Sequence, residues 1–495
     1  MTGMPPSVQL RRLPELVAGF ASDAPDVAVA ELTLDSREVR PGTLFLACRG
    51  TRQHGLDFLP QALAAGAGAL LWEPAPGVTP PAVSIPAVAV EGLSRRVGEI
   101  AARFFGHPSA ALHVVGVTGT DGKTSTAWLI AGALDALGEP CLYLGTLGSG
   151  RVGALVPGDH TTPDPVSLQR RLAGARAEGL RAVAMEVSSH ALDQARVGGV
   201  AFHTAILTNV GRDHLDYHGT LEDYAAAKRR LFREFPLKAA VLNADDALGR
   251  DWSAQLAREH SRVPLTRYGL GEGDLVARNV VLSPTGLAFD VQTPRGAGRI
   301  DSRLLGRFNV YNLLAALGAL LARGIEIGRA CEALSRVATV PGRIEGFRGP
   351  GTKPLVIVDY AHTPQALAQV LHAARAHCAA TMWCVFGCGG DRDKGKRPLM
   401  GAAAAKNADR LIVTDDNPRS ENPAIIVQQI QAGIPAGSRA RVIHDRATAI
   451  ETAVREAGPD DVVVVAGKGH EDYQLYGAER RSFSDRAFVA RLVGQ

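Results

Sequence analysis

Short runs of β-branched residues alternate with longer Ala- and Leu-rich stretches along most of this chain. This alternation is typical of βαβ units, in which parallel strands form a sheet and the connecting helices cover its faces. Ligands of such sheets bind outside the carboxyl ends of the strands, so we expect functional residues in the loops that follow the strands. The expected strands are residues 113–117, 181–187, 201–210, 355–361, 381–387, 410–416 and 461–467.

The chain has 495 residues, which is more than one hydrophobic core usually supports. A Pro-rich stretch at 72–86 and a Gly- and Pro-rich segment at 338–354 interrupt the alternation. We therefore predict an α/β fold of three domains: a smaller N-terminal α/β domain, a central parallel sheet with helices on both faces, and a C-terminal Rossmann-like domain. The predicted bounds are 1–97, 98–340 and 341–495.

Charge and cysteine usage exclude several classes of protein. The formal net charge is only +4, with both signs interspersed, which argues against nucleic acid or a membrane surface as partner. We find neither a signal region at the N-terminus nor an uncharged apolar run long enough to span a membrane. The six cysteines follow no disulfide or zinc spacing, so we expect a reducing cytoplasm and buried free thiols at Cys384 and Cys388.

Residues 113–138 combine a β-branched strand, a glycine turn and a helical pattern. The turn reads as a compressed G-x-x-G-K-T, because Val117 stands where the longer phosphate-binding loop has a glycine. A helix N-terminus presents backbone N–H groups to phosphates, Lys123 would add a positive charge and Thr124 a hydroxyl for Mg²⁺.

Two other interpretations of the turn stay open. It can be a structural βα turn with a solvated lysine, or a dinucleotide turn built on Gly116, Gly119 and Gly122. The second leaves Lys123 and Thr124 without a role, and no acidic residue ends a strand near residue 140. ATP is therefore the favoured ligand.

Polar residues also follow the next strands. Glu186 ends one strand and His214 follows another, and a carboxylate and an imidazole beside Thr124 can assemble a magnesium site. A histidine is an unusual ligand for this hard ion, and His214 can equally be an ordinary loop histidine.

Lys228 interrupts the apolar face of the helix expected at 221–235. It can extend its ammonium to solvent. If it is buried, its pKa falls and the neutral amine can add CO₂ to become a carbamate, which is an oxygen ligand for a metal.

Later loops add further candidates. Asn309 and Asn312 share one face of a helix within 306–324, and Asp359 and His362 follow a strand. Arg343 lies in a turn between two predicted domains, where it could reach a γ-phosphate when the domains close.

Taken together, these motifs resemble the Mur ligases, the family of ATP-dependent amide-forming ligases of peptidoglycan precursor synthesis. The resemblance runs from residues 33–39 (TLDSREV) through 119–124 (GTDGKT) to 466–474 (AGKGHEDYQ). One departure is Asp121, where the family usually has Asn, and its role is an open question. The segments 387–401, 414–423 and 466–471 are similar to those of members that add diaminopimelate to UDP-N-acetylmuramoyl-L-alanyl-D-glutamate.

The resemblance implies an N-terminal domain that binds the UDP substrate, a central domain of P-loop type that binds ATP, and a C-terminal domain that binds the amino acid. It implies a reaction through an acyl phosphate, with Lys123, Lys228, His214 and Arg343 as catalytic residues. The implied ATP contacts are Gly119, Thr120, Asp121, Gly122, Lys123, Thr124, Ser125, Asn309, Arg343, Asp359 and His362. The implied Mg²⁺ site comprises Thr124, Glu186, His214 and Lys228 as its carbamate.

The resemblance also implies two substrate sites. Contacts to the UDP-linked substrate are expected at its uridine nucleotide from Ser36, Thr51, Arg52 and Gln53, with Leu34 beside them, and at its muramoyl-dipeptide from Thr161, Thr162, Ser188, Gln194 and Arg196. The amino-acid pocket is expected to comprise Arg392, Asp415, Asn417, Pro418, Arg419, Gly467 and Glu471. All partners are small molecules, with no nucleic acid and no membrane insertion, and we expect a monomer.

The choice of amino acid has a physical basis. Diaminopimelate differs from lysine by a carboxylate at its far end, which Arg419 can bind in a bidentate fork while Glu471 takes the neighbouring ammonium. Lysine would leave Arg419 unpaired, at a cost of roughly 1–3 kcal/mol or more.

Alternatives to this assignment are that 415–423 is only a solvated turn, that the chain is a lysine-adding ligase, or that it resembles folylpolyglutamate synthase. A non-catalytic nucleotide-binding regulator is the alternative from another class.

Overall fold

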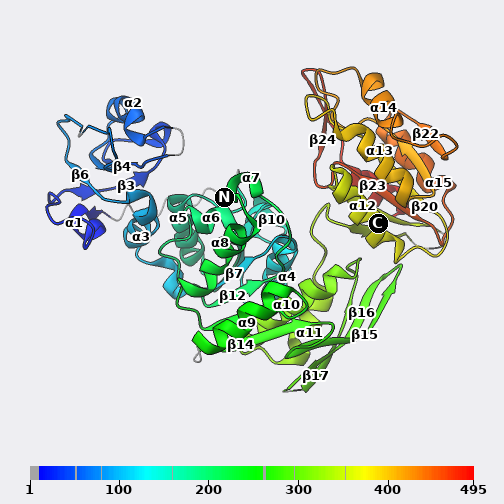
Figure 1. The fold of residues 1–495 in the computed structure, drawn as a ribbon, viewed down its shortest axis with the longest axis horizontal. Helices are drawn as coiled ribbons and strands as arrows, with labels where there is room; N and C mark the ends of the chain where they lie inside the picture. Colours follow the sequence, from blue (N-terminus) through cyan, green and yellow to red (C-terminus); the bar gives the residue numbers. More distant parts are fainter. Residues whose placement is uncertain are drawn as a thin grey trace. The chain divides into compact units, whose positions relative to one another are not determined.

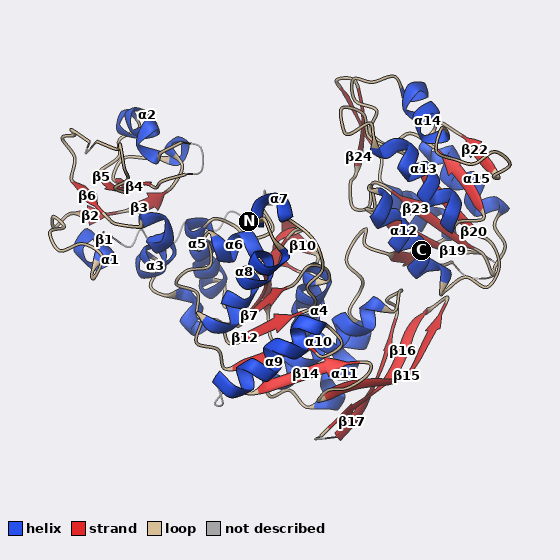
Figure 2. Ribbon diagram, viewed as in Figure 1, coloured by secondary structure: helices blue, strands red, loops and turns tan. Residues whose placement is uncertain are grey.

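The computed structural model describes residues 10–50, 53–79, 81–158, 160–259, 263–294, 296–349, 351 and 353–495. Contacts divide the chain into two compact units, Met1–Tyr268 with Gly318–Arg323, and Gly269–Leu317 with Gly324–Gln495. Both units combine helices with β-sheets (Figure 2), and each contains a sheet of mainly parallel strands, so the predicted α/β class is confirmed. The domain bounds near 97 and 340 stay predictions.

The N-terminal sheet of the first unit has the parallel order β3-β4-β5-β6. All five residues of β4 are buried, because Leu44 and Leu46 enter one apolar cluster while Phe45 and Ala47 enter another on the opposite face. Coverage of both faces explains the continuous apolar run of this strand. The elements are β1 (Arg11–Arg12), α1 (Leu13–Val17), β2 (Ala28–Val29), β3 (Glu31–Thr33), β4 (Thr43–Ala47), α2 (Leu59–Ala64), β5 (Ala69–Trp72), β6 (Ala87–Ala89) and α3 (Leu93–Phe104).

The larger sheet of the first unit has the order β10-β9-β8-β11-β7-β12-β13-β14. Figure 1 labels β7, β10, β12 and β14 of this sheet. The strands β8, β11, β7, β12, β13 and β14 run parallel to one another. At the edge of the sheet, β9 pairs antiparallel with both β8 and β10. The strands are β7 (His113–Thr118), β8 (Cys141–Gly145), β9 (Gly148–Arg151), β10 (Ala154–Val156), β11 (Ala182–Glu186), β12 (Thr204–Leu207), β13 (Ala239–Asn243) and β14 (Leu265–Gly269). The helices are α4 (Lys123–Ala136), α5 (Pro165–Ala177), α6 (Ser189–Asp193), α7 (Leu215–His218), α8 (Leu221–Arg233) and α9 (Ala247–Glu259).

The chain reverses direction across this sheet at β7. It passes from β7 through α4 to β8, returns to β11, and then places β12 on the other side of β7. Ligands of open α/β sheets bind at such a switch point, outside the carboxyl ends of the strands. The loop after β7 is the glycine turn that the sequence predicts as a phosphate site.

The second unit contains an antiparallel set, β15-β16-β17, and a C-terminal sheet of order β18-β19-β23-β20-β21-β22 in which only β18 is antiparallel. Apolar clusters cover both faces of the C-terminal sheet. The strands are β15 (Leu275–Ser283), β16 (Gly286–Thr293), β17 (Gly296–Ser302), β18 (Glu345–Phe347), β19 (Leu355–Asp359), β20 (Met382–Phe386), β21 (Arg410–Val413), β22 (Ala440–Val442), β23 (Val462–Ala466), β24 (Tyr473–Tyr476) and β25 (Glu479–Ser482). The helices are α10 (Phe308–Ala322), α11 (Ile327–Arg336), α12 (Pro364–Arg375), α13 (Lys396–Asn407), α14 (Pro423–Gln431), α15 (Arg446–Glu456) and α16 (Asp485–Val493).

All seven strands expected from the sequence are present, each shortened at its ends or extended by one residue. Cys384 and Cys388 are buried free thiols, as predicted. Among the described residues, no helix combines the length and the apolar character that crossing a membrane requires.

Candidate active site

The glycine turn after β7 needs its glycines. Gly119 and Gly122 have φ values of 148° and 81°, and a Cβ on Gly119 would overlap the Thr208 hydroxyl. The ammonium of Lys123 donates to Gly119 O at 2.9 Å and to Thr120 O at 2.8 Å. Burial lowers the pKa of Lys123, although the negative charges of nearby carboxylates oppose this shift. Strand, turn and helix N-terminus thus have the geometry of an anion site.

The Glu186 carboxylate accepts hydrogen bonds from several groups around this turn. Thr124 Oγ1 donates to Glu186 Oε2 at 2.9 Å, and the Tyr143 hydroxyl and the Thr146 N–H each donate to Oε1 at 2.8 Å. The carboxylate is buried, and a Cβ on Gly145 would overlap it. Hydroxyl and carboxylate oxygens are the donors that Mg²⁺ prefers, so Thr124 and Glu186 fit this ion.

Asp121 and Ser125 complete the predicted nucleotide turn. Asp121 is exposed, its N–H donates to Asn209 Oδ1 at 3.0 Å, and its carbonyl accepts from the Thr208 hydroxyl at 2.6 Å. Ser125 is half-buried in the first turn of α4. Asp121 thus takes part in the turn through its backbone N–H and carbonyl.

Lys228 is buried rather than extended to solvent, with 1% of its surface exposed. Its ammonium donates to Gly119 O at 2.8 Å, the carbonyl that Lys123 also uses, and lies 4.2 Å from the centroid of the Tyr224 ring. Burial, and then repulsion from Lys123, lower the pKa of Lys228 to about 6. The side chain is therefore neutral at pH 7, which is the form that can add CO₂.

His214 also lies near Tyr224, with ring centroids 6.2 Å apart. Its φ is 52°, its side chain is about half exposed, and its Nε2 is 3.4 Å from Asp213 Oδ2. Among the described residues, no three His, Cys, Asp or Glu side chains lie close enough to hold a metal. The structure brings Thr124 to Glu186, and the full metal set with His214 and Lys228 stays a prediction.

The predicted muramoyl-dipeptide residues form one hydrogen-bonded group beside Glu186. Thr162 Oγ1 donates to Glu186 O at 2.9 Å and accepts from Ser188 N at 3.2 Å, and Thr161 Oγ1 is 3.1 Å from Thr146 Oγ1. Arg196 completes the group by donating to Thr162 O at 3.1 Å and to Gln194 Oε1 at 2.8 Å.

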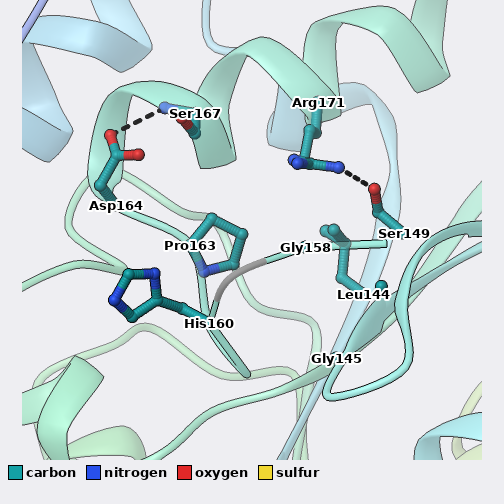
Figure 3. A pocket seen from close by; sticks show the side chains of 10 residues that line it. Leu144, Gly145, Ser149, Gly158, His160, Pro163, Asp164, Ser167 and Arg171 are labelled. Atoms are coloured by element: carbon teal, nitrogen blue, oxygen red, sulfur yellow. Dashed lines mark hydrogen bonds between the residues drawn. The ribbon is translucent and has the colours of Figure 1, made fainter. Parts of the chain in front are cut away.

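A small cavity of about 90 Å³ adjoins this group (Figure 3). On one side of it, Arg171 and Ser149 point toward each other and are hydrogen-bonded. On the other side, Asp164 accepts from the Ser167 N–H at 3.0 Å and caps the helix α5. The remaining lining residues are Leu144, Gly145, Gly148, Gly158, His160 and Pro163.

The predicted uridine contacts follow β3 and β4 of the N-terminal sheet. Leu34 is half-buried, and Ser36 is buried and donates to Gln61 Oε1 at 2.9 Å. Gln53 is exposed and its carbonyl accepts from Gly50 N at 3.0 Å. Thr51 and Arg52 lie outside the described residues. Because β3 and β4 are neighbouring parallel strands, the two loops leave the same edge of the sheet.

The second unit holds the later nucleotide candidates. Asn309 Oδ1 accepts from Asn312 Nδ2 at 2.8 Å, which confirms their shared helix face. Asp359 accepts from the backbone N–H groups of Ile344 and Ala361 at 2.8 and 2.7 Å, and burial raises its pKa.

Arg343 and His362 flank one aromatic ring in this unit. The guanidinium of Arg343 lies 5.4 Å from the centroid of the Tyr360 ring, within the range of a cation–π contact. His362 is exposed and its Nδ1 lies 3.0 Å from Tyr360 O.

The amino-acid candidates converge on the carboxyl ends of β21 and β23. Arg419 has φ 53°, its N–H donates to Leu475 O at 2.9 Å, and its Nη1 donates to Gly390 O at 2.7 Å. Asn417 Nδ2 donates to Glu471 Oε2 at 3.0 Å. Pro418 joins these two residues in the chain, and Arg392 is exposed nearby and donates to Asp391 O at 3.3 Å.

Asp415 and Gly467 make further contacts beside these amino-acid candidates. Asp415 accepts from the Tyr476 hydroxyl at 3.1 Å and lies 2.8 Å from His444 Nδ1. Gly467 has φ 119°, and a Cβ there would overlap Asp416 Oδ2.

Two buried ionic contacts near this pocket were not predicted from the sequence. Arg446 and Asp485 are both fully buried and are joined by two hydrogen bonds of 2.7 Å, and Arg446 also donates to Ala466 O at 3.0 Å. Lys468 is fully buried and lies 2.9 Å from Glu471 Oε2. The only sequence signal for Lys468 was its place in the segment 466–471, which resembles diaminopimelate-adding ligases. No sequence signal pointed to Tyr143.

Comparisons with known proteins cover nearly the whole chain. Three family models match, described as "Mur ligase family, catalytic domain" at residues 28–105, "Mur ligase middle domain" at 117–320 and "Mur ligase, glutamate ligase domain" at 342–469. A protein of Alkalilimnicola ehrlichii named UDP-N-acetylmuramoyl-L-alanyl-D-glutamate–2,6-diaminopimelate ligase is 52% identical over 96% of each chain.

A protein of Pseudomonas aeruginosa with the same name is 49% identical over 93% of this chain and 94% of its own. A solved structure of a ligase of this name matches with a TM-score of 0.78 and 36% identity, over 98% of this chain and 99% of that one. The chain thus has the three-domain α/β fold of solved Mur ligases.

Proposed function

This chain belongs to the Mur ligase family, and we propose that it uses ATP to join meso-2,6-diaminopimelate to UDP-N-acetylmuramoyl-L-alanyl-D-glutamate in peptidoglycan precursor synthesis. The observation that carries the proposal is the sequence identity of 52% and 49% to ligases of that name, over 96% and 93% of this chain. The chemistry of the residues in each unit supports it independently. The partners are small molecules, and a monomeric state is part of the proposal.

In the first step, the free carboxylate of the D-glutamyl residue attacks the γ-phosphorus of ATP. A bond forms between the carboxylate oxygen and phosphorus, and the bond to ADP breaks, which gives an acyl phosphate. Two anions approach each other in this step, so positive charge at the phosphates lowers the barrier. Lys123, at the N-terminus of α4, supplies such a charge, and Arg343 is a second candidate. Mg²⁺, when bound at Thr124 and Glu186, would neutralise phosphate charge.

In the second step, the amine of diaminopimelate attacks the acyl carbon. A tetrahedral intermediate forms, the carbon–oxygen bond to phosphate breaks, and the amine loses a proton as the amide is made. The residues around Thr162 and Arg196 hold the dipeptide so that its carboxylate stays oriented through both steps.

Lys228 acts in this proposal as a carbamate. Its amine is neutral above about pH 6, and the product of CO₂ addition is an anion that would attract a cation beside Thr124. A protonated ammonium at the same place would repel one. The burial of Lys228 beside Gly119 O thus supports the carbamate over a purely structural lysine.

Arg419 selects the amino acid. Within the described part of the chain, its guanidinium donates only from Nη1, to Gly390 O, so Nε and Nη2 are available to a carboxylate. The φ of 53° and the backbone bonds to Leu475 and Gly477 fix the direction of this side chain. A fixed guanidinium with free donors suits the far carboxylate of diaminopimelate, which lysine does not have.

The test is phosphate release from ATP with UDP-N-acetylmuramoyl-L-alanyl-D-glutamate and a panel of meso-diaminopimelate, L-lysine and L-glutamate. We expect release with meso-diaminopimelate alone. Equal turnover of L-lysine would overturn the amino-acid assignment. Glutamate addition to a folate in place of the UDP-dipeptide would favour a folylpolyglutamate synthase, and no release with any pair would favour a nucleotide-binding regulator.

A further inference from the structure

Lys468 is a fully buried lysine that contacts two predicted amino-acid-binding residues. Its ammonium donates to Glu471 Oε2 at 2.9 Å and to Asn417 Oδ1 at 3.2 Å, and lies 5.3 Å from the centroid of the Tyr473 ring. A buried ammonium is stable only where such partners surround it. The buried position of Lys468 therefore depends on these acceptors, and its hydrogen bonds in turn hold their side chains in place.

The orientation of the Asn417 amide follows from this contact. Its Oδ1 accepts from Lys468 Nζ and from the Leu475 N–H at 3.0 Å, and both of these groups are donors only. A reversed amide would place its NH₂ against two donors. Asn417 Nδ2 is therefore directed at Glu471 Oε2, to which it donates at 3.0 Å.

Only one oxygen of the Glu471 carboxylate, Oε2, accepts hydrogen bonds from the described residues. Oε2 accepts from both Lys468 and Asn417, whereas Oε1 has no partner within the described residues. The side chain keeps 18% of its surface exposed. One oxygen is thus anchored in the protein and the other is left for an incoming donor.

We propose that Lys468 is a positioning residue of the amino-acid site: it fixes the Asn417 amide and the Glu471 carboxylate so that Glu471 Oε1 accepts from the ammonium group of the amino acid. The proposal rests on the proposed function, which supplies an amino acid with that group. Lys468 itself is buried and contacts no substrate.

The competing explanation is that Lys468 only packs the C-terminal domain. A double-mutant cycle separates the two, because a residue that acts through Glu471 loses its effect when Glu471 can no longer pair with an ammonium. The cycle uses K468M, which keeps an unbranched chain of similar length, E471Q and the double variant. Phosphate release is measured while diaminopimelate is varied at saturating ATP and UDP-dipeptide.

We expect K468M to raise KM for diaminopimelate about tenfold to a hundredfold, the range for a lost hydrogen bond to a charged group. KM for ATP should stay within about twofold, since the nucleotide residues are unchanged. In the E471Q background, K468M should change KM by less than about threefold. K468Q keeps an N–H donor for both acceptors and should fall between K468M and the unsubstituted chain.

K353M is the matched control, because Lys353 lies in the same unit and, as far as the described residues go, its ammonium donates only to the Leu492 carbonyl, at 2.7 Å. It should leave KM for diaminopimelate unchanged. An unchanged KM in K468M, or the same fold-change with and without E471Q, would overturn the role of Lys468. If K468M does not fold, K468Q passes through the same cycle with the same criterion. No phosphate release by the unsubstituted chain with diaminopimelate would instead overturn the proposed function, and the assigned ammonium with it.

Discussion

Replacement of Lys228 by methionine should remove a contribution to stability that grows with pH. The folded chain holds Lys228 with a pKa of about 6, against an ordinary pKa of 10.5 for a lysine in the unfolded chain. Between these values the unfolded chain binds one proton that the folded chain does not. The free energy of unfolding therefore rises with pH, by about 1.4 kcal/mol per pH unit.

Between pH 7 and pH 9, this difference amounts to about 3 kcal/mol in the unsubstituted chain. Lys228→Met lacks the titrating group, so the gap in unfolding free energy between the two proteins should change by about that amount. The altered packing of methionine adds a constant that cancels when the two pH values are compared. Below pH 5, Lys228 is protonated in both states and the gap should stop changing.

The assay is urea unfolding of both proteins at pH 5, 7 and 9, in buffers freed of CO₂ so that the carbamate does not form. Lys238→Met, which removes an exposed lysine of the same unit, controls for the loss of a lysine as such. A gap that is equal at pH 7 and pH 9 would show that Lys228 keeps its proton in the fold. The carbamate assignment would fall with it. Bicarbonate added at pH 9 should stabilise the unsubstituted chain and leave Lys228→Met unchanged.

Three further substitutions test other parts of the structure. Arg419→Lys loses the bidentate fork, so KM for diaminopimelate should rise about tenfold to a hundredfold and discrimination against L-lysine should shrink in a competition assay; unchanged discrimination would contradict the role of Arg419. Gly145→Ala would place a Cβ against the Glu186 carboxylate, so phosphate release should need a higher Mg²⁺ concentration. An unchanged Mg²⁺ requirement would argue against Glu186 as part of the ion site. Arg446→Met leaves the buried carboxylate of Asp485 unpaired, which should cost about 3–5 kcal/mol in calorimetric unfolding; a loss below about 1 kcal/mol would mean that the pair contributes little.

Local pattern was enough to predict the elements that carry the site. The strand before Gly119 and the helix after it follow from β-branched and apolar spacing. The apolar face around Lys228 left burial and extension to solvent both open, and the structure shows burial. The antiparallel strands β15 to β17 were not predicted. Their signals were the alternation within 275–293 and the Pro-Thr-Gly turn at 284–286, which were not weighed against the βαβ pattern.

Contacts between distant segments could not be read from the sequence. Tyr143 reaches Glu186 because β8 is a neighbour of β11, and that order is a property of the whole sheet rather than of either strand. Lys468 meets Asn417 across 51 positions, although β20 lies between the strands β23 and β21 that precede them. Spacing thus located candidate residues one at a time, and the strand order decided which of them share hydrogen bonds.

The ion pair between Arg446 and Asp485 links the pocket to a remote piece of chain. Asp485 is the first residue of α16, while Arg446 also donates to the carbonyls of Asp415 and Ala466, where two pocket loops begin. A fusion partner, crosslink or binder that pulls α16 off the sheet would therefore loosen amino-acid recognition without touching a ligand. A ligand bound to the outer surface of this helix would act on the amino-acid pocket without competing with the substrates.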